Sequence, residues 1–304
     1  MKKRLPLIIL SLLVIMAGLC GCAPSSQDTP LLWKVCDNDS YVYLFGSIHV
    51  ATKDLYPLSN TIMDAYHSCD HLALEVSPDE MQTPEAMAAM AEYMRYDDGT
   101  LVTDVIGQEL FNEIVTILKS EFPNLQEDAL LSYRPMMLQN LLQTVIIGKT
   151  DLSEEYGIDT NFYNTALKAR KPILSLEPYD MQLEIFKGFS QTENIHMLKT
   201  LLDIEKQAEA TAQSYAAWRK GDQSALIEYE TTPASADSTD YNIYLELGIK
   251  RNLHMTDVID GYLKDNKKVF VIAGAAHMIG NEGIASLLKN KDYTVELISG
   301  QAIR

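Results

Sequence analysis

Two segments near opposite ends of the chain each have the pattern of a buried strand that ends at a glycine and then delivers a histidine. The first is Tyr41–His49 and the second is Lys267–Gly280. In the second segment an apolar, largely β-branched run stops at Gly274, three residues before His277. In α/β proteins the end of such a strand lies at the mouth of the sheet, where ligands bind. We therefore expect a fold that brings the two histidines, His49 and His277, together.

Two further segments are predicted to be strands that end near a carboxylate. They are His71–Val76, which contains Glu75, and Pro172–Glu177. A carboxylate rarely ends a buried strand unless it is paired or bound to a metal. With the two Gly-x-x-His segments, these strands predict two related halves that place two histidines and two glutamates at one cleft. The alternative for the glutamates is a salt bridge, for which Arg251 is the obvious partner.

The remaining sequence is mostly helical in its spacing. The first two strands, Leu31–Cys36 and Ser40–Phe45, are predicted to form a hairpin, and Tyr293–Ile298 is a last strand. We expect an α/β fold, a single domain with a mixed central β-sheet of two pseudo-symmetric halves flanked by helices, plus a helical insertion at about residues 82–148. The predicted helices are Pro57–Cys69, Thr83–Gly148 with breaks near 97–99 and 123, Gly157–Arg170, Tyr179–Phe189, Thr192–Lys220, Tyr244–Lys264 and Asn281–Leu288, and Thr231–Thr239 is a predicted loop.

The N-terminus has the features of a bacterial lipoprotein signal. Three basic residues precede Leu5–Leu19, an apolar run too short for an ordinary membrane span. The sequence Leu19-Cys20-Gly21-Cys22 resembles the lipobox, with Cys22 as the lipidated residue, and ordinary signal cleavage nearby is the alternative. We expect a signal peptide over 1–21, a tether over 22–30, a domain over 31–304, and a lipoprotein anchored outside the cytoplasm, at the outer face of the cell membrane or in the periplasm.

The charge of the chain restricts its partners. The formal net charge is −17, and loss of the basic signal peptide makes it more negative. This argues against nucleic acid and against electrostatic binding to anionic lipids, so the lipid would do the anchoring.

Cys36 and Cys69 would remain in the mature chain, either as a disulfide or as two separate buried thiols.

Two imidazoles with one or two carboxylates suit a divalent metal. Nitrogen and oxygen donors without thiolate indicate Mn²⁺, Co²⁺, Fe²⁺ or Zn²⁺, which would activate a water, and a glutamate that is not a ligand would act as general base. Asp159, at the start of a helix, either complements the helix dipole or serves the site. Arg251 and Asn252 either lie on the surface or point inward to hold a carboxylate or an oxyanion.

Six segments together resemble the TraB/GumN family, also called TraB/PrgY/GumN, from about Leu31 to Ile298. The family is similar to the animal Tiki proteins, which are metal-dependent proteases, and more distantly to erythromycin-esterase and ChaN-like proteins. The resemblance implies that His49, Glu75 and His277 are the metal and catalytic residues, and that substrate choice depends on the helical stretch before Gly157. The six segments are Leu44–Val50, Leu74–Val76, Tyr156–Asp159, Leu176–Glu177 with Gln182, Arg251–Asn252 and Gly274–Gly280.

These observations lead to one hypothesis and two alternatives. We favour a lipid-anchored metallohydrolase that acts on peptides. One alternative is a protein that binds a peptide or small ligand without turnover, because PrgY-type relatives are associated with restraining a peptide pheromone. The other is a metal-free hydrolase with a histidine as general base. The candidate catalytic residues are Glu75, Glu177 and Arg251, the candidate metal ligands are His49, His277 and Glu75, and Asp159, Gln182 and Asn252 would orient the substrate or the other side chains.

Overall fold

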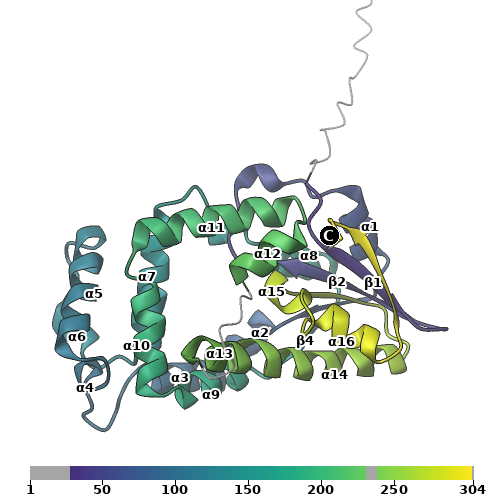
Figure 1. The fold of residues 1–304 in the computed structure, drawn as a ribbon. Helices are drawn as coiled ribbons and strands as arrows, with labels where there is room; N and C mark the ends of the chain where they lie inside the picture. The colour runs from purple at the N-terminus through teal and green to yellow at the C-terminus, as the bar shows by residue number, and fades with distance from the viewer. Residues whose placement is uncertain (1–27, 231–237, 303–304) are drawn as a thin grey trace, which may run out of the picture.

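The computed structural model describes residues 28–230 and 238–302 (Figure 1). It contains a six-stranded sheet in the order β4-β3-β5-β2-β1-β6, in which β2, β5, β3 and β4 are parallel and β1 is antiparallel to both β2 and β6. The predicted mixed α/β sheet with flanking helices is therefore confirmed. The strands are β1 (Leu32–Cys36), β2 (Tyr41–Ser47), β3 (His71–Leu74), β4 (Ile173–Ser175), β5 (Val269–Gly274) and β6 (Thr294–Ser299).

Several predictions fall on residues outside the described ranges. They are the signal peptide, the predicted lipidation site Cys22, residues 22–27 of the tether and most of the loop Thr231–Thr239. Within 28–230 and 238–302, none of the helices has the length and apolar character needed to cross a bilayer.

The four strands that carry the recurring motifs are neighbours in the sheet. β2 and β5 pair in parallel up to Ser47 opposite Gly274, so the two Gly-x-x-His turns leave the sheet side by side. β3 pairs with β5 on one side and with β4 on the other, where Leu74 lies opposite Ser175. The strands of the two sequence halves thus interleave in one sheet and end at the same edge, where their motif residues can meet.

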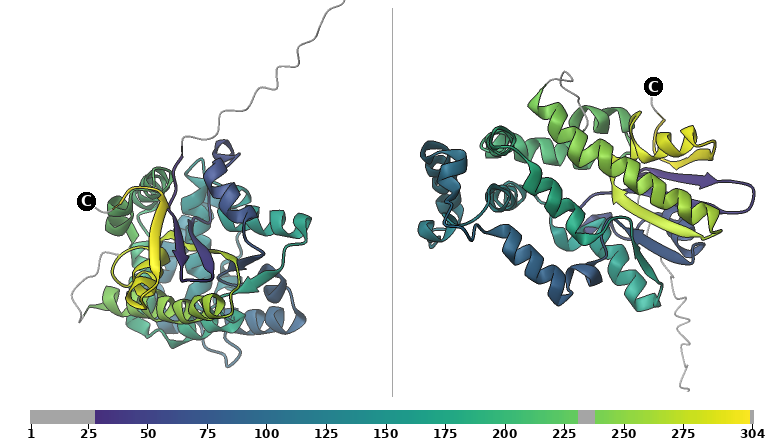
Figure 2. Two further views of the ribbon diagram at one scale, coloured as in Figure 1. Left: turned by 90° about the vertical axis from the view of Figure 1, so that its right-hand side faces the viewer. Right: turned by 90° about the horizontal axis from the view of Figure 1, so that it is seen from below.

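Helices cover both faces of the sheet. α1 (Asn60–His67) and α8 (Ile158–Ala169) lie on one face, and α14 (Lys250–Lys264) and α16 (Ile284–Asn290) lie on the other (Figure 2). Right-handed crossovers require this division, because the chain crosses the sheet in one direction through α1 and in the opposite direction through α14. The core under α1 and α8 is an aromatic cluster with ring centroids 5.1 to 5.8 Å apart, formed by Phe45, Tyr66, Phe162 and Phe270.

A group of helices beside the sheet has a core of its own. It includes α4 (Val102–Ile106), α5 (Gln108–Glu121), α7 (Pro135–Gly148) and α10 (Gln191–Thr200), and Figure 1 shows it at the side of the molecule away from β1. The predicted breaks near 97–99 and 123 lie between helices. The fully buried side chains of this second core are Val102, Phe111, Ile114, Leu118, Leu138, Leu142 and Leu198. The other helices nearby are α2 (Pro78–Met81), α3 (Pro84–Met94), α6 (Glu127–Leu130), α9 (Tyr179–Gly188), α11 (Ile204–Arg219) and α12 (Gln223–Glu230).

Two predicted helices are divided in the structure. The single helix predicted over Thr192–Lys220 is interrupted between α10 and α11, because the side chain of Asp203 accepts a hydrogen bond from the backbone N–H of Lys206 and so starts a new helix. Ahead of α14, the helix predicted over Tyr244–Lys264 contains a π-helical turn, η3 (Leu245–Ile249), which follows α13 (Thr239–Tyr244). Single π turns inside helices are frequent at functional sites.

The two cysteines of the described chain are separate thiols. Cys36 and Cys69 are both free, and Cys69 is buried. Burial raises the pKa of the Cys69 thiol to about 11. The structure therefore corresponds to the alternative without a disulfide.

Candidate functional site

A cavity of about 570 Å³ opens at the carboxyl ends of the parallel strands. Its wall includes His49, which follows β2, Glu75, which follows β3, and His277, which follows β5, together with Arg251 from α14. In α/β folds this is the edge of the sheet where ligands bind. The three residues predicted to bind a metal thus line one cavity.

Two glycines let chain segments approach closely enough to shape this cavity. A Cβ at Gly157 would lie 2.2 Å from the backbone oxygen of His49, so only glycine fits there. The close approach places Asp159, two residues later, beside the His49 side chain. A Cβ at Gly46 would lie 3.2 Å from Cα of Ala275, which shows how tightly the two Gly-x-x-His turns pack together.

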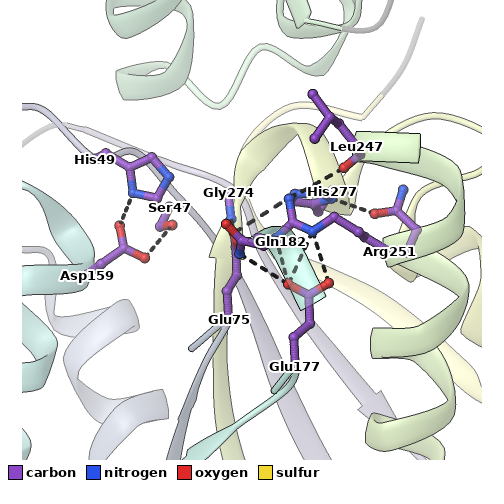
Figure 3. A network of polar contacts seen from close by, with 11 residues as sticks. Ser47, His49, Glu75, Asp159, Glu177, Gln182, Leu247, Arg251, Gly274 and His277 are labelled. Carbon is purple, nitrogen blue, oxygen red and sulfur yellow. Dashed lines mark hydrogen bonds and ion pairs between the residues drawn. The ribbon is translucent and has the colours of Figure 1, made fainter. Parts of the chain in front are cut away.

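Arg251 is the centre of a buried charge network (Figure 3). Its Nε donates to Glu177 at 2.9 Å, and its Nη2 donates to Oε2 of Glu177 at 2.7 Å and to Oε2 of Glu75 at 2.6 Å. The side chain of Arg251 is 8% exposed and that of Glu177 is fully buried. One guanidinium therefore pairs with two carboxylates. Both glutamates form the salt bridge with Arg251 that the sequence offered as the alternative to metal binding.

His277 is held in one tautomer by Asn252. The side-chain NH₂ of Asn252 donates to the backbone oxygen of Glu282 at 2.8 Å, so its oxygen accepts from Nδ1 of His277 at 2.6 Å. The proton of the neutral ring therefore lies on Nδ1, and Nε2 carries a lone pair. Nη1 of Arg251 donates to that lone pair at 3.1 Å, and burial lowers the pKa of His277. Asn252 is thus an inward-facing residue.

Glu75 connects the two sides of the cavity. Its Oε1 accepts from the backbone N–H of Gly274 at 2.7 Å and lies 4.0 Å from Nε2 of His277. Burial acts to raise the pKa of Glu75, but the neighbouring cationic groups, which are His277 when it is protonated, the permanent charge of Arg251, and His49, outweigh it and lower this pKa to about 2. Glu75 is therefore an ionised carboxylate at neutral pH.

His49 forms a second polar cluster on the opposite wall (Figure 3). Nδ1 of His49 donates to Oδ2 of Asp159 at 3.0 Å, and the hydroxyl of Ser47 donates to Oδ1 of the same carboxylate at 3.0 Å. The His49 side chain is 71% exposed. The hydrogen bonds of the described residues use only Nδ1 of His49. Because the pKa of His49 is raised to about 9, a metal bound at Nε2 would have to displace a proton at neutral pH.

The His49–Asp159 pair predicts a measurable titration. The hydrogen bond and the charge of Asp159 raise the pKa of His49 from 6.5 to about 9. Because the folded pKa is raised, the stabilisation from this pair is fully present below pH 6.5 and is lost as the pH rises through about 9. We expect the NMR signal of the His49 ring to titrate near pH 9 in metal-free protein, and to return towards 6.5 in Asp159→Asn. A wild-type midpoint near 6.5 would contradict the pairing.

The other predicted residues divide by distance from the cavity. Gln182 lines the cavity and its amide donates to Oε2 of Glu177 at 3.3 Å. Glu177 is 1% exposed and lies behind Arg251, outside the residues that line the cavity. Glu177 therefore contacts the cavity through Arg251, and its catalytic role stays a prediction.

Some residues of the site were not singled out by the sequence. Ser47 orients the carboxylate of Asp159, although it stands inside the first Gly-x-x-His motif. The helix α11 contributes Gln207, Thr211 and Ser214 to the cavity wall. Their spacing of four and three residues places them on one face of a helix. This row of uncharged polar residues on one helix face was the sequence signal that could have predicted their place in the cavity wall.

One family match covers the site and all of the sheet except the last two residues of β6. Residues 31–297 match the TraB/PrgY/gumN family. The chain belongs to the TraB/PrgY/gumN family. This agrees with the resemblance inferred from the six sequence segments, and the family match covers every candidate site residue from His49 to His277.

The family relatives include proteins named as metalloproteases. The chain is 21% identical to "Metalloprotease TIKI homolog" of Amphimedon queenslandica over 96% of this chain and 66% of that protein. It is 23% identical to "Metalloprotease TIKI2" of Xenopus tropicalis over 92% of this chain and 62% of that protein. A relative of similar size, "Uncharacterized protein YbaP" of Escherichia coli, is 23% identical over 84% of this chain and 92% of that protein.

The two Tiki proteins are longer than this family member. The chain spans a little under two thirds of the length of each of them. No solved structure matches the chain. The family membership and the distant Tiki relatives support a hydrolase.

The donor chemistry of the cavity suits a divalent metal. Each histidine has its Nδ1 fixed by an oxygen, from Asp159 or from Asn252, which leaves Nε2 in the orientation that metal-binding histidines use. Among residues 28–230 and 238–302, however, no three His, Cys, Asp or Glu side chains lie close enough to hold a metal. Arg251 takes the position of a cation beside Glu75 and His277, so a metal bound there would replace contacts of its guanidinium.

Proposed function

We propose that this TraB/PrgY/gumN family member is a lipid-anchored hydrolase outside the cytoplasm that cleaves peptide bonds with the help of a divalent metal. The observation that carries the catalytic part is the arrangement of one cavity: His49 and His277 line it with Nδ1 of each ring held by an oxygen, and the ionised Glu75 lies between them (Figure 3). The names of the Tiki relatives support both peptide cleavage and a metal.

The chain's own groups have separate roles in this proposal. Asp159 and Asn252 fix the two imidazole rings, and Glu177 holds the guanidinium of Arg251 in place. Arg251 supplies a fixed positive charge at the cavity wall that stabilises negative charge developing on a substrate carbonyl oxygen. The metal, Mn²⁺, Co²⁺, Fe²⁺ or Zn²⁺ by donor type, would be held by His49, Glu75 and His277 and would supply Lewis-acid polarisation.

The contact between Arg251 and His277 favours a second candidate, a metal-free hydrolase. In this candidate the guanidinium of Arg251 neutralises the charge of Glu75 without a metal. His277 is neutral because burial lowers its pKa. Nε2 of His277 would then accept a proton from the attacking water once Nη1 of Arg251 turns to the substrate oxygen.

Chelation separates these candidates. We expect the full-length protein, purified in detergent, to cleave members of a mixed peptide pool, to lose that activity in EDTA, and to regain it with one of the four metals. Metal analysis of the untreated protein is the accompanying readout. Turnover that survives EDTA would reject the metal and favour His277 as base. Peptide affinity without any cleavage would reject the hydrolase and favour a binding protein.

The membrane anchor rests on the N-terminal sequence alone. The basic start, the apolar run Leu5–Leu19 and the lipobox-like Cys22 support it. Lipid at Cys22 would hold an acidic protein at a membrane that its charge does not attract. A Cys22→Ser chain that stays in the membrane fraction would contradict this part of the proposal.

A further inference from the structure

A second cavity lies on the other side of His49 and Glu75. Its volume is about 510 Å³, and it shares His49, Glu75 and Gln182 with the first cavity. The site residues therefore stand at the junction of two hollows, each of the size that binds a ligand of several groups. A substrate that reaches into both would have its middle at the site.

The two cavities differ in the chemistry of their walls. The first cavity has the side-chain amides of Gln143 and Gln207 and the hydroxyl of Thr211 in its wall, beside apolar side chains such as Ile146, Leu201 and Trp218. The second has three half-buried methionines, and its charged side chains, His49, Glu75 and Asp159, are those of the site. Its other polar residues are Thr160, Tyr163, Asn164, Tyr179 and Gln182. The apolar residues that line the second cavity are Leu74, Val76, Pro78, Met81, Met90, Met136 and Leu183.

One helix runs along both cavities. Met136 of α7 lines the second cavity, and Gln143, Ile146 and Ile147 of the same helix line the first. The opposite face of α7 is buried in the second core. From Met136 to Ile147 the helix rises about 16 Å, the length of about five residues of extended peptide.

We propose that the second cavity binds a large apolar side chain of a peptide substrate, next to the bond that is cleaved. This inference rests on the proposed function and names its substrate class. Methionine side chains adapt to the shape of an apolar partner, so leucine, methionine and phenylalanine are all accepted. An acidic side chain is rejected, because it would leave water for an apolar wall beside the carboxylates of Glu75 and Asp159. The polar wall of the first cavity holds the peptide backbone on the other side of the bond.

The test uses pentapeptide libraries in which each position in turn is leucine, phenylalanine, alanine or aspartate. Cleavage is measured with the full-length wild type, and binding is measured by fluorescence polarisation with full-length His49→Ala. We expect one position to prefer leucine and phenylalanine over aspartate by about tenfold or more in both measurements. Position-dependent binding by His49→Ala without cleavage by the wild type rejects the hydrolase, and supports only that the second cavity binds an apolar side chain of a peptide.

Helix α3 offers a matched pair of variants. Met90 lines the second cavity, whereas Met87 on the same helix is 60% exposed to solvent. We expect Met90→Glu to remove the apolar preference and Met87→Glu to keep it, with thermal unfolding as the check on folding. Met136→Glu, from a different helix, gives the same result if Met90→Glu does not fold.

Three outcomes would overturn the inference. The first is the absence of any apolar preference, and the second is a preference that is unchanged in both Met90→Glu and Met136→Glu. The third is that a fatty acid such as laurate binds to this cavity while none of the peptides does. The last result would assign the cavity to an acyl chain.

Discussion

Arg251→Met is expected to lower the free energy of unfolding of the metal-free protein by about 3–5 kcal/mol. Methionine matches the length of the arginine stem but leaves Glu75 and Glu177 without their shared cation. Glu177 is fully buried and Glu75 is 15% exposed, so water cannot replace the lost contacts. Urea unfolding followed by circular dichroism, in EDTA, measures the change.

Arg219 is the matched control for this substitution. It also binds two carboxylates, those of Asp28 and Asp54, but its side chain is 28% exposed and Asp54 is 67% exposed. Arg219→Met should therefore cost about 1 kcal/mol or less. A second check is Arg251→Met combined with Glu177→Leu, which should recover part of the loss because one of the two stranded carboxylates is gone. Equal losses for Arg251→Met and Arg219→Met would contradict the buried network.

The sheet was predictable because its strands carry local signals. The run Val269–Gly274 is apolar and β-branched, and the turn between β1 and β2 has Asp37, whose carboxylate accepts from the backbone N–H groups of Asp39 and Ser40. The division between α10 and α11 was missed, because alanine, glutamine and glutamate continue the helical spacing on both sides of Asp203. An N-cap aspartate in a polar helical sequence resembles its polar neighbours, so the residue types alone do not mark the start of a new helix.

The residues of the candidate site were predictable, but the partners of several of them were not. The strand ends marked His49, Glu75 and His277, and all three line the cavity. The sequence left open whether Arg251 points outward, because a helical residue's direction depends on how the whole helix packs. The helix that carries Arg251 also follows a π turn, which nothing in the residue types of Leu245–Ile249 predicts.

The pairing of His49 with Asp159 shows the same limit. The two residues are 110 positions apart, and they meet because a glycine at 157 allows the backbone to approach His49. From the sequence, Asp159 could either complement the helix dipole or serve the site. The contact forms only when the start of α8 packs against the turn that follows β2, and that packing depends on the tertiary fold.

His49→Ala is expected to lower kcat/KM for peptide cleavage by at least about 100-fold and to leave the fold intact. The side chain is 71% exposed, so its loss should change the free energy of unfolding by about 1 kcal/mol or less. Asp159→Asn keeps the size of the partner but removes its charge, so the ring loses its fixed orientation and activity falls about 10–100-fold. Steady-state cleavage of one good peptide from the pool, with unfolding curves for each variant, gives these numbers.

The control is a second histidine–aspartate pair that lies away from the cavities. Nε2 of His196 is 2.5 Å from Oδ1 of Asp240, with both side chains exposed, and neither residue lines the cavity that holds His49. His196→Ala removes a comparable surface ion pair and should leave kcat/KM unchanged. If His49→Ala and His196→Ala have equal activity, the strand-end histidine has no role in the chemistry. Cleavage would then have to be assigned to the other wall of the cavity, where Glu75, Arg251 and His277 lie.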